Sequence, residues 1–116
     1  MKKALVFTAL FLAYTGFSQE LPTGVTYLPA TVSDEFCVQL DADQAVAEWY
    51  EMEIVHLGFT NQEDAQKAFW TRANNYVSYV VKHSENKVYV HVHIDRTPVA
   101  QDVTWWNTYF TSLCAE

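Results

Sequence analysis

Two histidines separated by one residue are the side chains in this sequence best suited to chemistry. His91 and His93 lie in a run of β-branched and aromatic residues, 87–95. Alternate residues of a strand point to the same face about 6 to 7 Å apart, and imidazole nitrogens bind zinc and copper. The pair is therefore a candidate Zn or Cu site, since calcium and magnesium prefer oxygen ligands. Exposed strands that bind nothing also contain this spacing.

A β-hairpin is expected to position the pair. The runs 76–83 and 87–95 are joined by a polar turn at residues 84–86, which is typical of two antiparallel strands. With residues 85 and 86 as the turn, the expected core pairs are Val81 with Val90, Tyr79 with Val92 and Val77 with Ile94. The opposite face is then the candidate binding face, and it carries Tyr76, Ser78, Tyr89, His91, His93 and Asp95.

A third histidine could complete a metal site. Residues 54–59 alternate between apolar positions and a second set that contains His56 and Gly58, so we expect a strand with His56 turned away from the core. If this strand lies beside the second strand of the hairpin, His56, His91 and His93 converge. Asp95 would then be a fourth ligand or would orient an imidazole.

Catalytic motifs are weak in comparison. Ser78 and His93 could face each other across the hairpin with Asp95 nearby, but nothing resembles a nucleophile elbow or an oxyanion hole. The three glycines of the chain do not form a phosphate-binding loop. The clustered carboxylates Glu48, Glu51 and Glu53 are typical of a solvated surface. We therefore expect a protein that is not an enzyme.

The remaining pattern supplies the other elements. A strand is expected at residues 35–40, one or two helical turns within 41–52, a helix from a Thr60 cap to about residue 75, and a last helix that begins at Thr97 or Asp102. The expected apolar stripe of the last helix consists of Val99, Val103, Trp106, Phe110 and Leu113.

This element order predicts an α+β fold. A β-α-β-β-α core with an additional N-terminal strand forms a two-layer sandwich, in which the helices cover one face of a mostly antiparallel sheet. The order resembles the ferredoxin-like arrangement without its last strand, over about residues 34–114, with the strand near Cys37 in the missing place. The resemblance implies that the other sheet face, which carries the histidines, is open.

The N-terminus has the pattern of a Sec-type signal peptide. Residues 1–18 contain Lys2 and Lys3, an apolar run, and small residues before a cut between Ser18 and Gln19. The apolar run is shorter than the roughly 20 residues that span a bilayer. We expect export to the periplasm or the extracellular space without membrane insertion. After the signal peptide, the chain is expected to form an extended surface arm at 19–33 and one domain at 34–116.

Two cysteines, Cys37 and Cys114, are the only ones in the chain. In an exported protein of this size a disulfide between them is the expected state. A redox pair and a thiolate metal site are the alternatives, but there is no C-x-x-C spacing.

Charge and aromatic content limit the partners. The chain has 14 acidic and 7 basic residues, a formal net charge of −7, so nucleic acid and other phosphate-rich partners are not expected. The core stripes do not account for Trp49, Trp70 and Trp105, and exposed aromatic residues favour protein or carbohydrate contacts. The first hypothesis is a small, acidic, exported binding domain that uses the open sheet face, including by self-association. The alternative is a Zn/Cu-binding protein.

Overall fold

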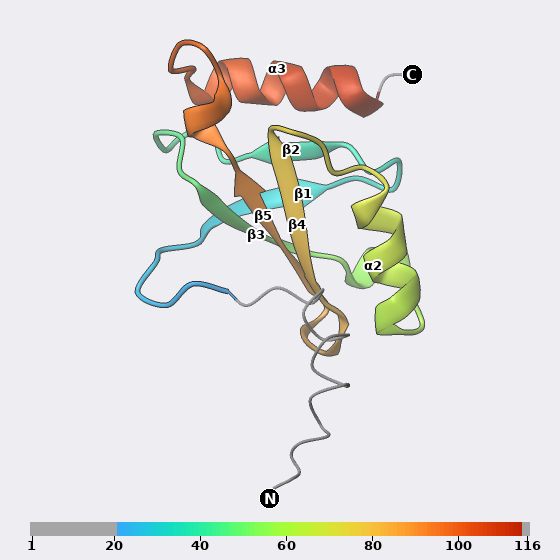
Figure 1. Ribbon diagram of the computed structural model, residues 1–116. Helices are drawn as coiled ribbons and strands as arrows, with labels where there is room; N and C mark the ends of the chain where they lie inside the picture. The colour runs from blue at the N-terminus through green and yellow to red at the C-terminus, as the bar shows by residue number, and fades with distance from the viewer. Residues whose placement is uncertain (1–20, 115–116) are drawn as a thin grey trace, which may run out of the picture.

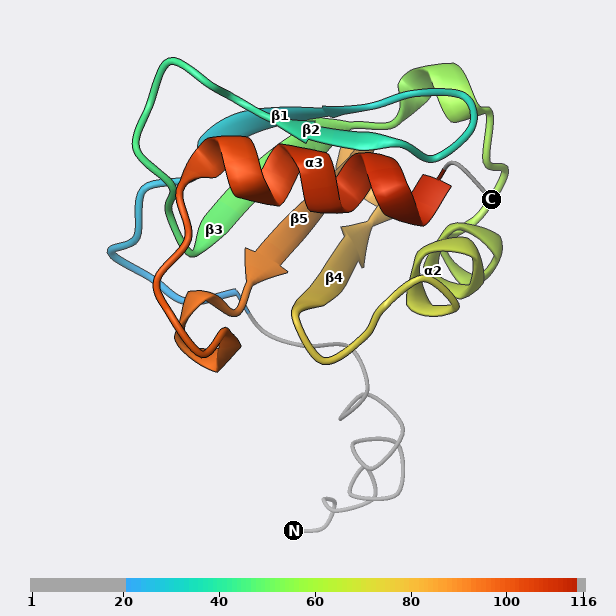
Figure 2. The same ribbon diagram turned by 90° about the horizontal axis from the view of Figure 1, so that it is seen from above.

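The computed structural model describes residues 21–114, which form one mixed sheet and two α-helices (Figure 1). The five strands lie in the order β2-β1-β3-β5-β4. Helix α3 crosses over the sheet, and α2 lies beside β4 at one edge (Figure 2). The strands are β1 (Leu28–Val32), β2 (Val38–Leu40), β3 (Trp49–Glu53), β4 (Val77–Lys82) and β5 (Lys87–Val92), and the helices are α2 (Gln62–Trp70) and α3 (Val103–Cys114).

The α+β class is confirmed, and the sheet is mixed. Strand β1 runs antiparallel to β2 and parallel to β3, whereas β5 pairs antiparallel with both β3 and β4. The sheet is therefore not strictly antiparallel. The ferredoxin-like element order is not confirmed, because three strands precede α2 in the described chain.

The expected N-terminal arm contains a strand inside the sheet. Residues 28–32 form β1, which lies between β2 and β3, and Ala30 and Val32 are buried. This part of the arm is therefore not a surface segment. Pro29 is compatible with the strand because a proline lacks only the donor N–H, and its carbonyl accepts a hydrogen bond from the Asp41 N–H at 3.2 Å.

The elements expected between residues 41 and 59 are wrong in type. Residues 49–53 form β3 instead of helical turns, and the alternating burial of Tyr50 and Met52 is the period of a strand. Residues 55–57 form a short 3₁₀ helix, which ends at Gly58 with φ of 71°. A strand could not continue through this left-handed residue, so His56 lies on a turn.

The hairpin is confirmed, but its register differs by two residues from the expected one. Its connection is a short 3₁₀ helix at His83–Glu85, closed by Asn86 with φ of 55°. The longer turn places Val81 opposite Val88 and Ser78 opposite His91. A shift of two residues keeps each side chain on its expected face, whereas a shift of one would exchange the faces.

The helices begin later than the first expected caps, α2 by one residue and α3 by five. The Asn61 side chain, and not Thr60, accepts the Asp64 N–H at 2.8 Å, and α2 ends at Trp70. The α3 cap is Asp102, whose carboxylate accepts the Trp105 N–H at 2.9 Å, as in the second of the two expected starts. Val99 and Leu113 of the expected apolar stripe are exposed.

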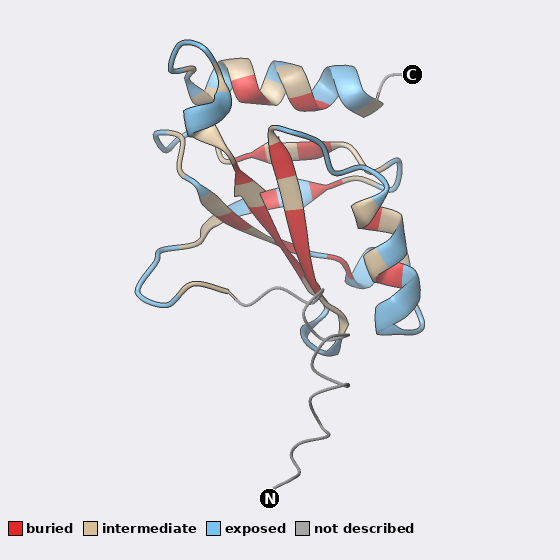
Figure 3. Ribbon diagram, in the orientation of Figure 1, coloured by how far each residue is buried: buried red, intermediate tan, exposed pale blue. Residues whose placement is uncertain are grey.

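The core lies between the sheet and the two helices (Figure 3). Trp106 and Phe110 of α3 are buried, and so are Ala65 and Phe69 of α2. On the sheet, the core face of the hairpin is the expected one, and it comprises Val77, Tyr79, Val81, Val88, Val90 and Val92. Ile94, expected in this face, follows β5 in a 3₁₀ helix and is half-buried.

A disulfide joins Cys37, next to β2, to Cys114 at the end of α3, as expected. The Cα atoms are 5.2 Å apart, and 77 residues separate the two cysteines in sequence. No helix in the described residues is long and apolar enough to cross a membrane. The expected signal peptide, residues 1–18, lies outside the described residues.

Candidate functional site

The sheet face opposite the helices brings His91 against an aromatic ring. In the β3–β5 ladder Trp49 lies directly opposite His91. The indole and the imidazole are stacked, with centroids 4.3 Å apart and planes inclined by 10°. Since Val90 and Val92 point into the core, the alternation of β5 turns His91 to the other face.

His93 follows the end of β5 and lies beside His91. The two imidazole centroids are 4.0 Å apart at an angle of 48°. The ring position is held by Ser78 of β4, whose Oγ lies 2.7 Å from His93 Nε2. The His93 N–H also donates to the Tyr76 carbonyl at 2.8 Å, which fixes the backbone at this point. Ser78, His91 and His93 are thus brought together as expected.

A tyrosine from the segment before β1 extends this cluster. The Tyr27 ring makes edge contacts with Trp49 at 5.9 Å and with Tyr89 at 5.2 Å between centroids. Its hydroxyl donates to the Pro22 carbonyl at 2.9 Å. We define the sheet-face patch as the half-buried residues Tyr27, Trp49, Ser78, His91 and His93.

Tyr89 lies under this patch and is covered. Its side chain is 8% exposed, and its hydroxyl donates to the Glu85 carboxylate at 2.9 Å. Burial, together with the hydrogen bond and charge of Glu85, raises the pKa of Tyr89 to about 12. The expected open face is therefore partly closed, because Tyr27 packs over Tyr89.

Burial also governs the charge of the two imidazoles. It lowers the pKa of His91 below the usual 6.5, against the opposing effect of the Glu48 carboxylate. Burial and the neighbouring His91 lower the pKa of His93. Both rings are therefore mainly neutral at pH 7.

Three expected site residues lie elsewhere. Tyr76 packs on the helix side, with its ring 5.6 Å from that of Tyr109. Asp95 is exposed in the 3₁₀ helix after His93. His56 lies beyond the end of β3 that pairs with Lys87, four residues along β5 from His91, and its Nε2 is 2.7 Å from the Val32 carbonyl oxygen. It does not converge with the other histidines.

The cluster combines three kinds of chemistry. Two adjacent imidazoles can chelate a metal ion, but no group of three or more His, Cys, Asp or Glu side chains with metal-binding geometry exists among the described residues. The Ser78–His93 contact is that of a nucleophile and a base, yet within residues 21–114 no hydrogen bond joins Asp95 to His93. The aromatic rings offer planar apolar surface beside polar groups.

The sequence singles out Trp49 only as an aromatic residue outside the core stripes and does not place it in the candidate binding face, and Tyr27 is not expected at the site at all. Trp49 could have been found from the sequence, because residues 49–53 alternate in polarity as a strand does. No local pattern identifies Tyr27, since its contacts depend on the path of the chain over the sheet.

Comparison with known proteins gives no match: no family model fits the chain, and no curated protein or solved structure matches it.

Proposed function

We propose that this chain is a small exported binding domain that holds an uncharged carbohydrate on the sheet-face patch. The observation that carries the proposal is the stack of His91 on Trp49, beside the hydrogen-bonded pair of Ser78 and His93. Planar rings with polar edges suit a ligand that has both apolar faces and hydroxyl groups.

The surroundings favour a small ligand over a large protein partner. A stable protein interface uses about 20 to 30 residues on each side, whereas the patch contains five defined residues, all half-buried. The low count of basic residues disfavours a polyanionic ligand. The disulfide and the expected signal peptide are consistent with a protein that works outside the cytoplasm.

The test is calorimetric titration of the oxidised protein with a panel of neutral oligosaccharides, namely cello-, malto-, xylo- and chito-oligosaccharides. We expect one class to bind and Trp49→Ala to weaken it roughly tenfold, the effect of losing one aromatic contact of about 1.4 kcal/mol. Trp105→Ala is the matched control because Trp105 lies on α3, stacked on Tyr109. Ser78→Ala is a milder second variant, expected to weaken binding severalfold.

Two results would overturn the proposal. One is that no panel member binds at millimolar concentration. The other is that Trp105→Ala weakens binding as much as Trp49→Ala while both variants remain folded. Concentration-dependent sedimentation of the wild type, abolished by Trp49→Ala, would instead assign the patch to self-association.

We also propose, as a second candidate, that the patch binds Zn²⁺ or Cu²⁺ through His91 and His93. The 4.0 Å between their ring centroids favours it. Stoichiometric metal should then raise the melting temperature by several degrees through preferential binding to the folded state. The double variant His91→Ala/His93→Ala should lose this response, whereas His56→Ala should keep it. A wild-type protein whose melting is unchanged by either metal contradicts this candidate.

A further inference from the structure

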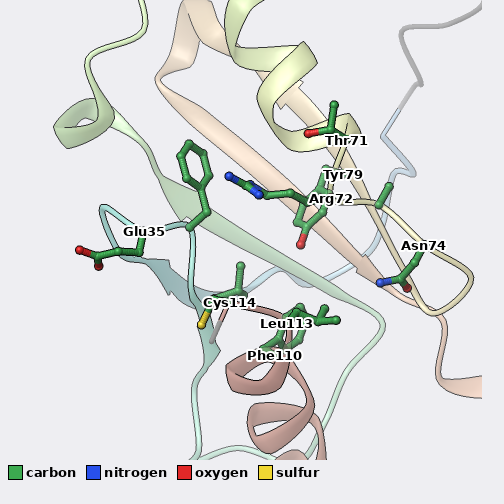
Figure 4. A pocket seen from close by; sticks show the side chains of 11 residues that line it. Glu35, Thr71, Arg72, Asn74, Tyr79, Phe110, Leu113 and Cys114 are labelled. Carbon is green, nitrogen blue, oxygen red and sulfur yellow. The ribbon is translucent and has the colours of Figure 1, made fainter. Parts of the chain in front are cut away.

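A cavity of about 320 Å³ lies on the helix side of the sheet, away from the sheet-face patch. It is formed by the β1–β2 loop, the chain just after α2, and the last turns of α3 (Figure 4). This volume is at the lower end of the range of small-molecule sites. Phe36, Phe110 and Leu113 supply the apolar wall of the cavity, and Leu113 is 39% exposed.

Arg72 provides a positive charge at this cavity. Its guanidinium carbon lies 4.3 Å from the centroid of the Phe36 ring. Stacking on a ring fixes the guanidinium plane and leaves its N–H edges free for a planar anion. Among the described residues the ion pair found is between Lys87 and Glu51, so Arg72 has no carboxylate partner there. That is notable in a chain with 14 acidic residues.

Tyr79 provides a second polar group in the same wall. Its side chain is 5% exposed, yet its hydroxyl points into the cavity (Figure 4). No hydrogen bond of this hydroxyl occurs within the described residues, and its oxygen is open to the cavity, so it is free to donate to a bound ligand. Burial raises the pKa of Tyr79 to about 12, against the opposing charge of Arg72, so the group remains an O–H donor at neutral pH.

The loop that carries Phe36 is held in an unfavourable conformation. Phe36 has φ of 64°, which a bulky residue rarely adopts. The conformation is maintained by the Phe36 N–H bond to the Ser33 carbonyl at 2.9 Å and by the bond of the Cys37 N–H to Ser33 Oγ at 3.1 Å. Residues in such conformations cluster at ligand sites. Here the positive φ of Phe36 places its ring under the Arg72 guanidinium.

We propose that this cavity binds a small monocarboxylic acid with an apolar body. The carboxylate accepts hydrogen bonds from the N–H groups of Arg72 and from the O–H of Tyr79. The apolar body of the ligand packs on Phe110 and Leu113. Glu35 also lines the cavity. Its carboxylate repels an anion, so a single negative charge is preferred over the double charge of a phosphate monoester.

The experiment is calorimetric titration of the oxidised protein with phenylacetate and octanoate, compared with phenylacetamide and phenyl phosphate. At least one carboxylate should bind, with phenylacetamide and phenyl phosphate at least tenfold weaker. Arg72→Gln should weaken the carboxylate about tenfold and Tyr79→Phe severalfold, with Arg72→Lys between Arg72→Gln and wild type. Lys67→Gln is the matched control, since it removes the same charge from an exposed position on α2.

The proposal is overturned if neither carboxylate binds at 10 mM, if phenylacetamide binds as well as phenylacetate, or if Lys67→Gln weakens binding as much as Arg72→Gln. Tyr79→Phe, which removes only one oxygen, keeps the test valid if Arg72→Gln does not fold. Trp49→Ala should leave carboxylate affinity unchanged, so failure here and failure of the carbohydrate proposal are separate results.

Discussion

Trp49 and His91 meet because residue 49 lies opposite residue 91 in the ladder between β3 and β5. The same alternation that sends Tyr50 and Val90 into the core leaves these two rings on the other face. Residue contacts of this kind depend on register. On the helix side, Trp106 shows the cost of close packing, since it is fully buried and its Nε1–H has no hydrogen-bond partner among the described atoms.

The raised pKa of Tyr79 predicts a loss of stability in alkali. The ordinary tyrosine pKa is 10.0, and burial raises it to about 12 in the folded protein, with Arg72 opposing and Tyr109 adding to the shift. Between pH 10 and 12 the unfolded chain loses this proton while the folded chain keeps it. Stability contributed by Tyr79 is therefore complete below pH 10 and falls by about 2–3 kcal/mol as pH rises to 12.

Urea unfolding of wild type and Tyr79→Phe at pH 9, 10, 11 and 12 measures this effect. The wild type should lose more stability than the variant between pH 10 and 12. Parallel curves for the two proteins would show that Tyr79 titrates normally.

At the scale of elements, short polar residues determine where helices and turns begin and end. Asn61 caps α2 and Asp102 caps α3 through side-chain oxygens. Asn86 closes the hairpin connection in the left-handed region, where asparagine is tolerated better than most residues. Each of these side chains stabilises only its own helix or turn, so each can be substituted without affecting the others.

The observed α2 cap predicts unequal effects of two neighbouring substitutions. Asn61→Ala should cost about 1 kcal/mol of unfolding free energy, because the Asp64 N–H loses its acceptor. Thr60→Ala, at the position that the capping pattern suggested, should have little effect. Chemical denaturation of both variants measures the difference, and a larger loss for Thr60→Ala would refute the observed cap.

The hairpin connection predicts a preference at position 86. Asn86→Gly should be nearly neutral, since glycine adopts positive φ without steric cost. Asn86→Ala should destabilise by about 1 kcal/mol, because its Cβ is strained at φ of 55°. Equal melting temperatures for the two variants would contradict the left-handed assignment.

For the molecule as a whole, the disulfide connects the strand edge of the fold to its last helix. It joins the chain beside β2 to the end of α3 across 77 residues. Closing a loop of this length restricts the unfolded chain, which on the chain-entropy model stabilises the fold by about 4 kcal/mol. Small domains depend on such links because they bury little surface.

Reduction of this bond should therefore lower stability strongly. Cys37→Ser/Cys114→Ser should lose about 4 kcal/mol in urea unfolding, as should wild type in excess reductant. The reductant should not change the double variant further, which serves as the control. A loss below about 1 kcal/mol would show that the loop is already restricted in the unfolded state.

The sequence predicted the elements whose signals are local. The hairpin faces, the meeting of Ser78, His91 and His93, and Asp102 as the second of two possible α3 starts follow from alternation and capping chemistry. The disulfide follows from the count of two cysteines and not from a local pattern. Local sequence patterns gave the wrong element where contacts with distant segments determine the structure. Proline and glycine near residues 22–29 concealed β1, whose place in the sheet depends on partners from distant segments.

The errors at the site have the same origin. His56 was expected beside His91 because a strand was assigned five residues too late, and Gly58 ends a turn at that point. Tyr76 was assigned to the binding face by extending the hairpin one residue too far. The Arg72 cavity joins three distant segments, so no local pattern could predict it.

The most direct test of the sheet-face patch is an amide and indole chemical-shift titration of the ¹⁵N-labelled, oxidised protein with the oligosaccharide panel. A binding oligosaccharide should shift the Trp49 indole and the amides of Ser78, His91 and His93, while the Trp105 indole on α3 stays unchanged. Shifts that gather on α3 or around Arg72, with the Trp49 indole unmoved, would contradict the proposal that this face binds the ligand.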